Sequence, residues 1–449
     1  MQNPSQATEP AVAQDCDVLV IGGGPAGCTV APLLAEKGHK VVVLEKAHHP
    51  RFHIGESLLP ANLPLFERLG VAEEVKAIGM VKRAAEFVSF ADNKEQVFQF
   101  AEAWDGKSMP HAYQVLRSKF DEIMIRNTEK KGVEVHEGCR ARSVDFLPNN
   151  AGAVVEAESD DGSTMRWKAR FVVDASGRDT FLANKFKIKH RNPKHNSSSV
   201  YGHFAGARRH DGDAEGNITI FWFEHGWFWF IPMMDDQTSI GMVTWPYFMK
   251  TMGKRSLTEF LMDGIAMCPP LAERLKDARL INEVEATGNF SYVSERNHGP
   301  NYVLLGDAYA FIDPVFSSGV LLAMNSGFIA ADAIDTTLKH PEQSAAAMQE
   351  FDRLMKHGPK EFSWFIYRIT NPNMRDIFMH PRNVLRVKEA LLSLLAGDVF
   401  GKTPIWGAIR VLKSIYYITA LSRPKRSWMA WKKRKFNIRP VEDAEMGTA

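Results

Sequence analysis

The sequence is poor in cysteine and contains no long apolar run. Its cysteines, which form neither a CxxC pair nor a metal-ligand spacing, are Cys16, Cys28, Cys139 and Cys268. This scatter argues against a disulfide framework or a cysteine-based metal site. No apolar stretch approaches the ~18 residues of a membrane-spanning helix, and the N-terminus lacks the basic and apolar regions of a secretory signal. We therefore expect a cytoplasmic protein with no bound metal and a disordered leader over residues 1–14.

Excess charge of either sign is also absent. The formal net charge is +2 in 449 residues, so no global field indicates a nucleic acid as partner. The length allows one or two domains.

A basic tail, residues 422–449, combines lysines and arginines with Trp428, Met429, Trp431 and Phe436. This tail can contact an anionic membrane surface or an acidic partner such as a carrier protein, or its tryptophans can pack back on the body.

The N-terminal segment DCDVLVIGGGPAGCTVAPLLAEKGHKVVVLEK carries a nucleotide-binding pattern. The apolar runs Val18–Ile21 and Val41–Leu44 predict two buried strands separated by a helix. A GxGxxG turn with Ala26 joins the first strand to the helix; its glycines are Gly22, Gly24 and Gly27. They provide a tight turn, close approach to a pyrophosphate and close helix packing. We expect a dinucleotide whose phosphates face the helix N-terminus.

An acidic residue completes this pattern. Glu45 directly follows the second strand, about 20 residues beyond the glycines, where a carboxylate can accept hydrogen bonds from ribose hydroxyls. The pattern by itself does not choose between NAD and FAD.

A distant segment resembles flavoproteins. In NYVLLGDAYAFIDPVFSSG, a buried strand at Tyr302–Leu305 leads into Gly306 and Asp307, and a helix is expected near Ser318. This arrangement resembles the second fingerprint of flavoproteins of the para-hydroxybenzoate hydroxylase type. The resemblance implies that Asp307 binds the ribityl chain of FAD and that the following helix N-terminus faces the flavin.

Two other segments fit the same superfamily. RFVVDASGRDT contains the strand and Asp-Ala-Ser-Gly turn that the superfamily places beside FAD, which implies Asp174 as a cofactor-binding residue. Arg117 in YQVLRSKFDEIM matches its arginine near the cofactor. The implied fold is α/β (α+β), with a Rossmann-like FAD-binding domain.

The periodicity of apolar residues predicts the secondary structure of the other parts of the chain. Alternating apolar and aromatic residues predict an antiparallel substrate sheet, and later apolar periodicity predicts helices. The expected organisation is a core of residues 15–340 with FAD-binding segments 15–60, 110–180 and 285–335 and a substrate sheet from 80–112 and 197–245, then a helical cap over 341–421 and the basic tail.

Three short motifs narrow the resemblance. HIGESLLP resembles the GES segment of flavin-dependent halogenases and of their geranylgeranyl-reductase relatives, which implies Ser57 near the cofactor. WFWFIP, Trp227–Pro232, fits the WxWxIP pattern of the halogenases, and FIDPVFSSG fits their FxxPxxSxG pattern through Phe311, Pro314, Ser317 and Gly319. The chain thus resembles a flavin-dependent halogenase, and the match implies Pro314 and Gly319 as cofactor-binding residues.

The tryptophan motif places two indoles on one strand face. Trp227 and Trp229 alternate along a predicted strand; on spacing alone this is an ordinary aromatic core face. In the halogenase family, FADH2 and O2 oxidise a halide to hypohalous acid. The resemblance implies that the pair screens the flavin from water and from the organic substrate.

The family also uses a lysine that guides hypohalous acid to the substrate. Lys82 keeps its spacing after GES, although Ala84 and Ala85 replace the family's Gly-Ala. A lysine desolvated among apolar neighbours has the lowered pKa of a usable nucleophile or proton donor. The ordinary alternative is a surface lysine.

The halide has a candidate site at the later loop. Ser317, Ser318 and Gly319 offer backbone N–H groups at a helix start, which can bind a small anion. A simple N-cap serine explains the same residues. The sequence does not distinguish chloride from bromide.

The predicted substrate is an electron-rich aromatic of the phenol or pyrrole class. The segment VLLAMNSGF lacks the glutamate that tryptophan halogenases place near this loop, so we do not expect free tryptophan. The substrate can be free or tethered to an acyl carrier protein. No second nucleotide-binding motif is found, which favours a separate flavin reductase as the source of FADH2, in secondary metabolism.

Other functions share much of this scaffold. A flavin monooxygenase that hydroxylates an aromatic ring would not need Lys82, and a geranylgeranyl-reductase-like enzyme would not need both the tryptophan pair and the FxxPxxSxG loop. A degenerate flavoprotein that binds FAD and serves only as a partner is a non-catalytic alternative.

Overall fold

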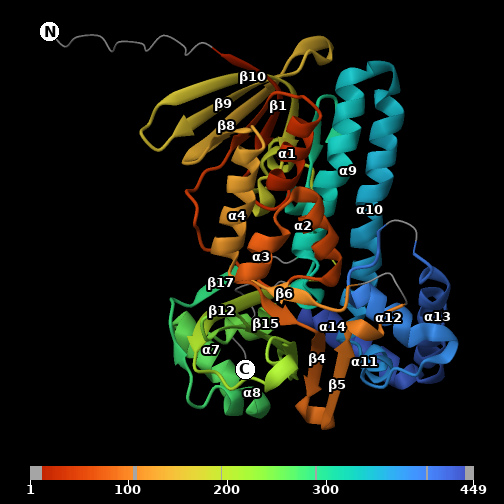
Figure 1. Ribbon diagram of the computed structural model, residues 1–449. Coiled ribbons are helices and arrows are strands. Elements are labelled where there is room, and N and C mark those ends of the chain that lie inside the picture. Colours follow the sequence, from red (N-terminus) through yellow and green to blue (C-terminus); the bar gives the residue numbers. More distant parts are fainter. Residues whose placement is uncertain (1–12, 105–108, 194, 289–290, 401–402, 440–449) are drawn as a thin grey trace.

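A computed structural model describes residues 13–104, 109–193, 195–288, 291–400 and 403–439. Figure 1 shows two sheets, one in the upper and one in the lower half of the molecule, with the C-terminal helices beside the lower one. Residues 1–12 of the predicted leader lie outside the described residues. Gln14 already belongs to the first strand, β1 (Gln14–Ile21).

The first sheet is mostly parallel and combines strands from distant parts of the chain. Strand β2 (Val41–Leu44) has the bounds expected from the sequence and is buried throughout, as befits a parallel strand covered on both faces. The other strands continue the order β19-β20-β10-β1-β2-β7, with β9 on β10 and β8 on β9. Their bounds are β19 (His298–Gly299), β20 (Tyr302–Leu304), β10 (Thr164–Asp174), β7 (Glu134–His136), β8 (Cys139–Phe146) and β9 (Ala153–Ser159).

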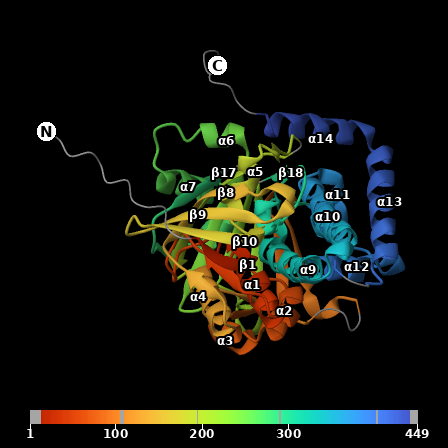
Figure 2. The same cartoon turned by 90° about the horizontal axis from the view of Figure 1, so that it is seen from above.

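Helices cover this sheet and fix the site. Gly22 has φ +109°, and a Cβ on Gly27 would lie 1.9 Å from the Gly22 carbonyl oxygen, so the turn into helix α1 needs both glycines. Helices α1 and α9 lie side by side in both views (Figures 1 and 2). The helices of this half are α1 (Gly27–Glu36), α2 (Leu63–Leu69), α3 (Ala72–Ile78), α4 (Arg117–Lys130), α5 (Phe181–Lys185) and α9 (Gly319–Lys339).

The second sheet contains the tryptophan strand, β14 (Gly226–Pro232). Trp227, Trp229 and Ile231 belong to one apolar cluster, whereas Phe228 and Phe230 belong to another on the opposite face. The order is β16-β12-β15-β14-β13-β4-β5, with β17 on β12. The bounds are β16 (Arg279–Leu280), β12 (Ser198–Ala205), β15 (Gln237–Thr244), β13 (Ile218–Phe223), β4 (Ala84–Ser89), β5 (Lys94–Gln99) and β17 (Glu285–Gly288).

The prediction of an antiparallel substrate sheet is wrong for one pair of neighbouring strands. Strand β4 pairs with β13 in parallel, from Ala85 opposite Ile218 onward. No hairpin joins these two strands, so chain connectivity does not impose an antiparallel direction. The ends of the predicted segment, β3 (Met80–Lys82) and β6 (Ala112–Gln114), form a separate two-stranded sheet.

Helices dominate the C-terminal part of the chain. Their apolar sides pack against the face of the second sheet that carries Trp227 and Trp229. Among the described residues, no helix has both the length and the apolarity needed to cross a bilayer. These helices are α10 (Ser344–Ile369), α11 (Pro372–Met379), α12 (Val387–Leu395), α13 (Trp406–Ser422) and α14 (Pro424–Asn437).

Smaller elements complete the described fold. Three short strands form a separate sheet, and short helices pack on the face of the second sheet opposite the tryptophans. Their bounds are β11 (Lys189–Arg191), β18 (Tyr292–Ser294), β21 (Ala310–Phe311), α6 (Pro246–Lys250), α7 (Leu257–Ala266) and α8 (Pro269–Arg274).

The close approach of α1 to β1 leads to a stability prediction. We expect Gly27→Ala to lower the free energy of unfolding by about 1–3 kcal/mol, because the added methyl group must displace backbone. Urea unfolding measures this change. The matched control is Gly407→Ala, at a helical glycine whose Cβ would meet nothing within 4 Å; this change should be neutral or stabilise by up to about 1 kcal/mol. Equal loss in both variants would contradict the packing argument.

Candidate active site

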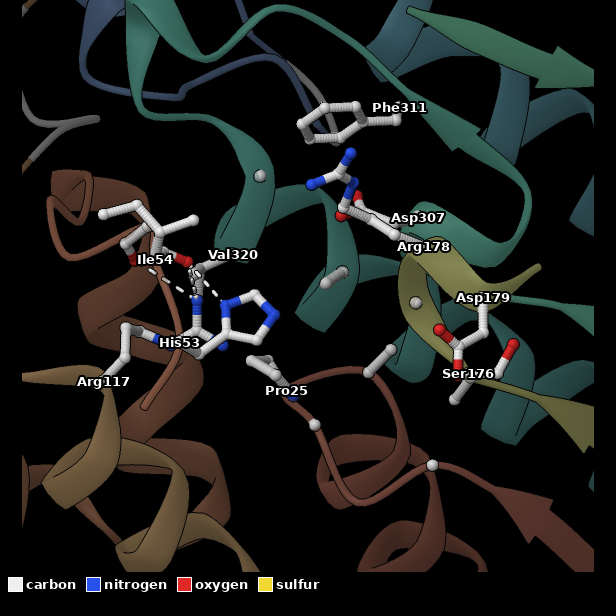
Figure 3. A pocket seen from close by; sticks show the side chains of 18 of the residues that line it. Pro25, His53, Ile54, Arg117, Ser176, Arg178, Asp179, Asp307, Phe311 and Val320 are labelled. Carbon is white, nitrogen blue, oxygen red and sulfur yellow. Dashed lines mark hydrogen bonds between the residues drawn. The ribbon is translucent and has the colours of Figure 1, made fainter. Parts of the chain in front are cut away.

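A cavity of about 680 Å³ lies between the two sheets. One wall comes from the first sheet and its turns, and the opposite wall comes from apolar side chains of the second sheet, including Ile218, Ile220 and Trp229. In Figure 3, Arg178, Asp307 and Phe311 gather on one side of the cavity, and His53 and Arg117 lie on the other. Its size and mixed lining are those of a cofactor or ligand site.

The glycine turn lies at one end of this cavity. Gly22, Gly24 and Ala26 line it, and a Cβ on Gly24 would have only Arg51 near it, at 3.9 Å. Gly27 does not line the cavity and instead allows α1 to pack on the strand. The open space beside Gly24 leaves room for a phosphate group at the start of α1.

Glu45 lines the cavity at the end of β2. Its Oε2 accepts a hydrogen bond of 2.7 Å from the Gly23 N–H, and its Oε1 accepts one of 2.9 Å from the Ala47 N–H. The carboxylate is therefore held in place by backbone donors. Its predicted contact with ribose hydroxyls uses the remaining acceptor capacity and stays a prediction.

Arg117 begins helix α4 and lines the cavity. Its Nη1 donates to the Ile54 carbonyl at 3.0 Å, and its Nε and Nη2 donate to Asp121 at 2.9 and 3.0 Å. Burial alone would raise the pKa of the Asp121 carboxyl, but the Arg117 guanidinium outweighs burial and holds that pKa below its usual range. The bidentate pair fixes the arginine against the segment that carries the GES motif.

Asp174 ends strand β10, directly before the turn that the resemblance places beside the cofactor. Its Oδ1 accepts from the Ser176 N–H at 3.0 Å and its Oδ2 from the Leu182 N–H at 2.7 Å. It is fully buried beneath the cavity, and burial raises the pKa of its carboxyl. The residues of this turn that line the cavity are Ala175 to Asp179. Asp174 therefore shapes the turn that lines the cavity, while its role as a cofactor-binding residue stays a prediction.

The second fingerprint reaches the cavity through Asp307. Gly306 adopts φ +51° next to Ala26 and Ala323, and Asp307 lines the cavity. Burial raises the pKa of Asp307 to about 6, against the opposing charges of Arg178 and Arg117. A carboxyl group in this position can bind a hydroxyl group, as the ribityl prediction requires.

The predicted halide residues stand at the start of α9. Pro314, Ser317 and Gly319 line the cavity. Ser318 is the N-cap but makes no side-chain capping bond, and its buried Oγ has no hydrogen-bond partner among the described residues. The loop before it is held by Asp313, whose carboxylate accepts from the Val315 N–H at 3.2 Å. The N-cap alternative thus lacks its usual hydrogen bond, while halide binding stays a prediction.

Trp227 and Trp229 both line the cavity from the second sheet. Their ring centroids are 6.1 Å apart, and Trp229 Nε1 donates to Ser239 Oγ at 3.0 Å. Both indoles also belong to the apolar cluster that includes the C-terminal helices. They therefore present bulky apolar groups to the cavity and are backed by that cluster, a position compatible with a screen.

Lys82 is buried, with 1% of its surface exposed. Its Nζ donates to Ser57 Oγ at 2.9 Å and lies 5.4 Å from the ring centre of Phe100. Ser57 lines the cavity, whereas Lys82 lies just behind it. Burial lowers the pKa of Lys82 to about 7. The surface-lysine alternative is wrong; the substituted neighbour Ala84 is also buried, with its N–H bound to Asn217.

A buried pair beside this lysine was not recognised from the sequence. Glu56, which lines the cavity, and His203 on β12 place Oε1 and Nε2 2.7 Å apart. Glu56 belongs to the GES segment, so this sequence motif could have indicated it as a site residue. His203 is far away in the sequence, and only the packing of β12 over this loop brings it close.

The cavity suits FAD. The glycine turn, Glu45 and Asp307 provide a polar end for phosphates and hydroxyls, and the apolar wall of the second sheet suits a flat aromatic ring. When bound there, FAD supplies the redox chemistry. Among the described residues, no group of three potential metal-ligating side chains was found.

The known proteins that this chain resembles agree with a flavin site in this cavity. The tryptophan halogenase family profile matches residues 17–107 and 102–376. The chain belongs to the flavin-dependent halogenase family. It is 33% identical over 339 residues to a tryptophan 2-halogenase of Chondromyces crocatus, covering 75% of this chain and 64% of that protein. It is 31% identical to a 1H-pyrrole-2-carbonyl-[peptidyl-carrier protein] chlorinase of Pseudomonas fluorescens, covering 86% of this chain and 90% of that protein.

Solved structures show the same fold. A flavoprotein/dehydrogenase from Cytophaga hutchinsonii superposes with a TM-score of 0.81 at 28% identity, covering 91% of this chain and all of that one. The myxobacterial chondrochloren halogenase CndH, described as a variant of FAD-dependent halogenases, gives 0.75 at 29% identity, with 96% and 99% covered. The predicted fold class and the FAD cofactor of this halogenase-family chain are confirmed.

The buried lysine gives a pH-dependent stability. An unfolded chain keeps the lysine proton up to about pH 10, whereas folded Lys82 releases it near pH 7. Between these values the unfolded state binds more protons, so the free energy of unfolding should rise with pH. We expect the wild type to gain about 1 kcal/mol per pH unit from pH 7 to 9 relative to Lys82→Met. Urea unfolding at each pH measures the difference; parallel profiles would show that Lys82 is not desolvated.

Proposed function

We propose that this protein is a halogenase that uses FADH2, O2 and chloride or bromide to halogenate an electron-rich aromatic ring, a phenol or a pyrrole. The observation that carries the proposal is the buried Lys82, whose Nζ contacts Ser57 at the edge of the FAD cavity. A lone buried amine with a pKa of about 7 has no packing advantage over an apolar side chain, because burial disfavours its charged form. A chemical role accounts for an amine at this place.

Lys82 acts on the oxidant. Near neutral pH it exists in both protonation states, so it can donate a hydrogen bond to hypohalous acid or take up the halogen as a chloramine with loss of water. Either form delivers electrophilic halogen to a ring held nearby. The dry surroundings of Lys82, which include Phe100 and Ala84, protect the oxidant from bulk water.

The remaining site residues divide the other tasks. Trp227 and Trp229 keep water and the aromatic substrate away from the flavin, and the start of α9 at Ser317, Ser318 and Gly319 binds the halide. Gly24, Glu45 and Asp307 hold the cofactor, with Arg117 supporting the loop beside it. These assignments are supported by the placement of all but Ser318 in the cavity wall.

The partners follow from the same chemistry. A separate flavin reductase supplies FADH2 in the cytoplasm, and the reaction belongs to secondary metabolism. The substrate is free or carrier-bound; the related pyrrole chlorinase acts on a ring attached to a peptidyl carrier protein. The basic tail provides a contact with an anionic surface or an acidic partner.

The proposal predicts halide-dependent product that requires Lys82. Purified protein with FAD, a flavin reductase, NADH, oxygen and bromide or chloride should halogenate members of a panel of free and carrier-bound phenols and pyrroles, detected by halogen isotope pattern. We expect Lys82→Ala to lose product at least about 100-fold, the lower range for a proton-transfer or nucleophilic group, while still forming hydrogen peroxide.

Two controls sharpen this test. Lys76→Ala removes an exposed lysine on neighbouring α3 and should keep full activity, whereas Lys82→Arg should remain inactive because its guanidinium stays protonated. Oxygenated product without halide would instead identify a hydroxylase, and unchanged halogenation by Lys82→Ala would refute the lysine's role.

A further inference from the structure

The end of the described chain exposes an unusual density of large apolar side chains. On α14, Trp428, Trp431 and Phe436 are 56%, 52% and 59% exposed, and Met429 is 60% exposed. At the end of α13, Leu421 is 80% exposed. Scattered exposed apolar residues are normal, but a contiguous group indicates an interaction surface. We call this group, with the lysines between its members, the α14 face.

Lysines interleave with these aromatic residues. Lys432 Nζ lies 3.7 Å from the ring centre of Trp428, and Lys435 Nζ lies 4.0 Å from that of Trp431. No Asp or Glu occurs between Asp398 and Glu442. The α14 face therefore carries cations and indoles without opposing carboxylates from its own segment.

The inner side of α14 is fixed to the body of the protein. Arg423 Nη1 and Arg426 Nη2 donate to Asp376 of α11 at 2.9 and 3.2 Å, and Asn373 Nδ2 donates to Ser427 Oγ at 2.9 Å. The alternative in which the tail's tryptophans pack back on the body does not hold for Trp428 and Trp431, which are more than half exposed. Phe436 does contact the body, with its ring centre 5.1 Å from that of Tyr247. Figure 2 shows α13 and α14 along two outer edges of the molecule.

We propose that the α14 face binds the surface of an anionic phospholipid bilayer. Tryptophans suit the boundary between lipid headgroups and acyl chains, and lysines beside them suit lipid phosphates. The exposed Leu421 can enter the apolar layer, a role that an acidic soluble partner does not offer. The arrangement supports binding to the membrane surface by a helix fixed on its inner side.

The helix that carries Leu421 also packs into the interior of the protein. Helix α13 contributes Ile409, Leu412 and Tyr416 to the apolar cluster that contains Trp227 and Trp229. The helices that bear the α14 face are thus part of the cover over the tryptophan wall.

The test is co-sedimentation of the full-length FAD-loaded protein with phosphatidylcholine vesicles, with and without phosphatidylglycerol. We expect binding only to the anionic vesicles, weakened by added salt because the attraction is electrostatic. Lys432→Glu/Lys435→Glu and Trp428→Ser/Trp431→Ser should each weaken binding at least about tenfold. The matched control is Lys130→Glu/Lys168→Glu, which makes the same charge change at exposed lysines elsewhere.

Other outcomes overturn the membrane proposal. These are absence of binding to anionic vesicles, equal binding by wild type and both α14 variants, or binding of an acidic acyl carrier protein through this face with no vesicle binding. Halogenation of a soluble phenol, measured in parallel, should be unchanged in the α14 variants. Vesicle binding without halogenation would leave the bilayer contact standing while the proposed function fails, so the two failures are distinguishable.

Discussion

The hydrogen bond between Lys82 and Ser57 connects the two halves of the site. Ser57 belongs to the loop that closes the FAD cavity, and Lys82 ends the short strand that leads into the second sheet. Because the amine is buried, its charge is not stabilised by water, and its pKa falls to about 7. The geometry therefore requires that the loop and the second sheet stay packed together.

Several buried polar groups maintain that packing. Arg117 holds the loop before Ser57 by its bond to the Ile54 carbonyl, and Asp121 holds Arg117. On the other side of the loop, Glu56 Oε1 lies 2.7 Å from His203 Nε2 of the second sheet, close enough for an ion pair but outside hydrogen-bonding geometry. Burying such groups is costly unless they are paired. Their concentration around one loop indicates that its position is strictly specified.

The two faces of the second sheet pack against different parts of the molecule. One face of the second sheet meets α7 and α8, and the other meets both the cavity and the C-terminal helices. The tryptophan pair lies on this second face, so the same indoles line the cavity and form core. The functional and structural interpretations of the WxWxIP strand are therefore compatible, which the alternation of residues alone does not reveal.

The sequence by itself determined the local features whose causes are local. The glycine turn, β2 and the start of α9 follow from short-range sterics and periodicity, and their residues lie where the motifs predict. Tertiary structure alone decided the parallel pairing of β4 with β13, the inward bonding of Asp174, the burial of Lys82 and its proximity to Ser57. The outward orientation of Trp428 and Trp431 was decided in the same way. These features depend on which distant segments pack together and bury each other's side chains. That choice is made by the packing of the whole chain, so no local sequence pattern reveals it.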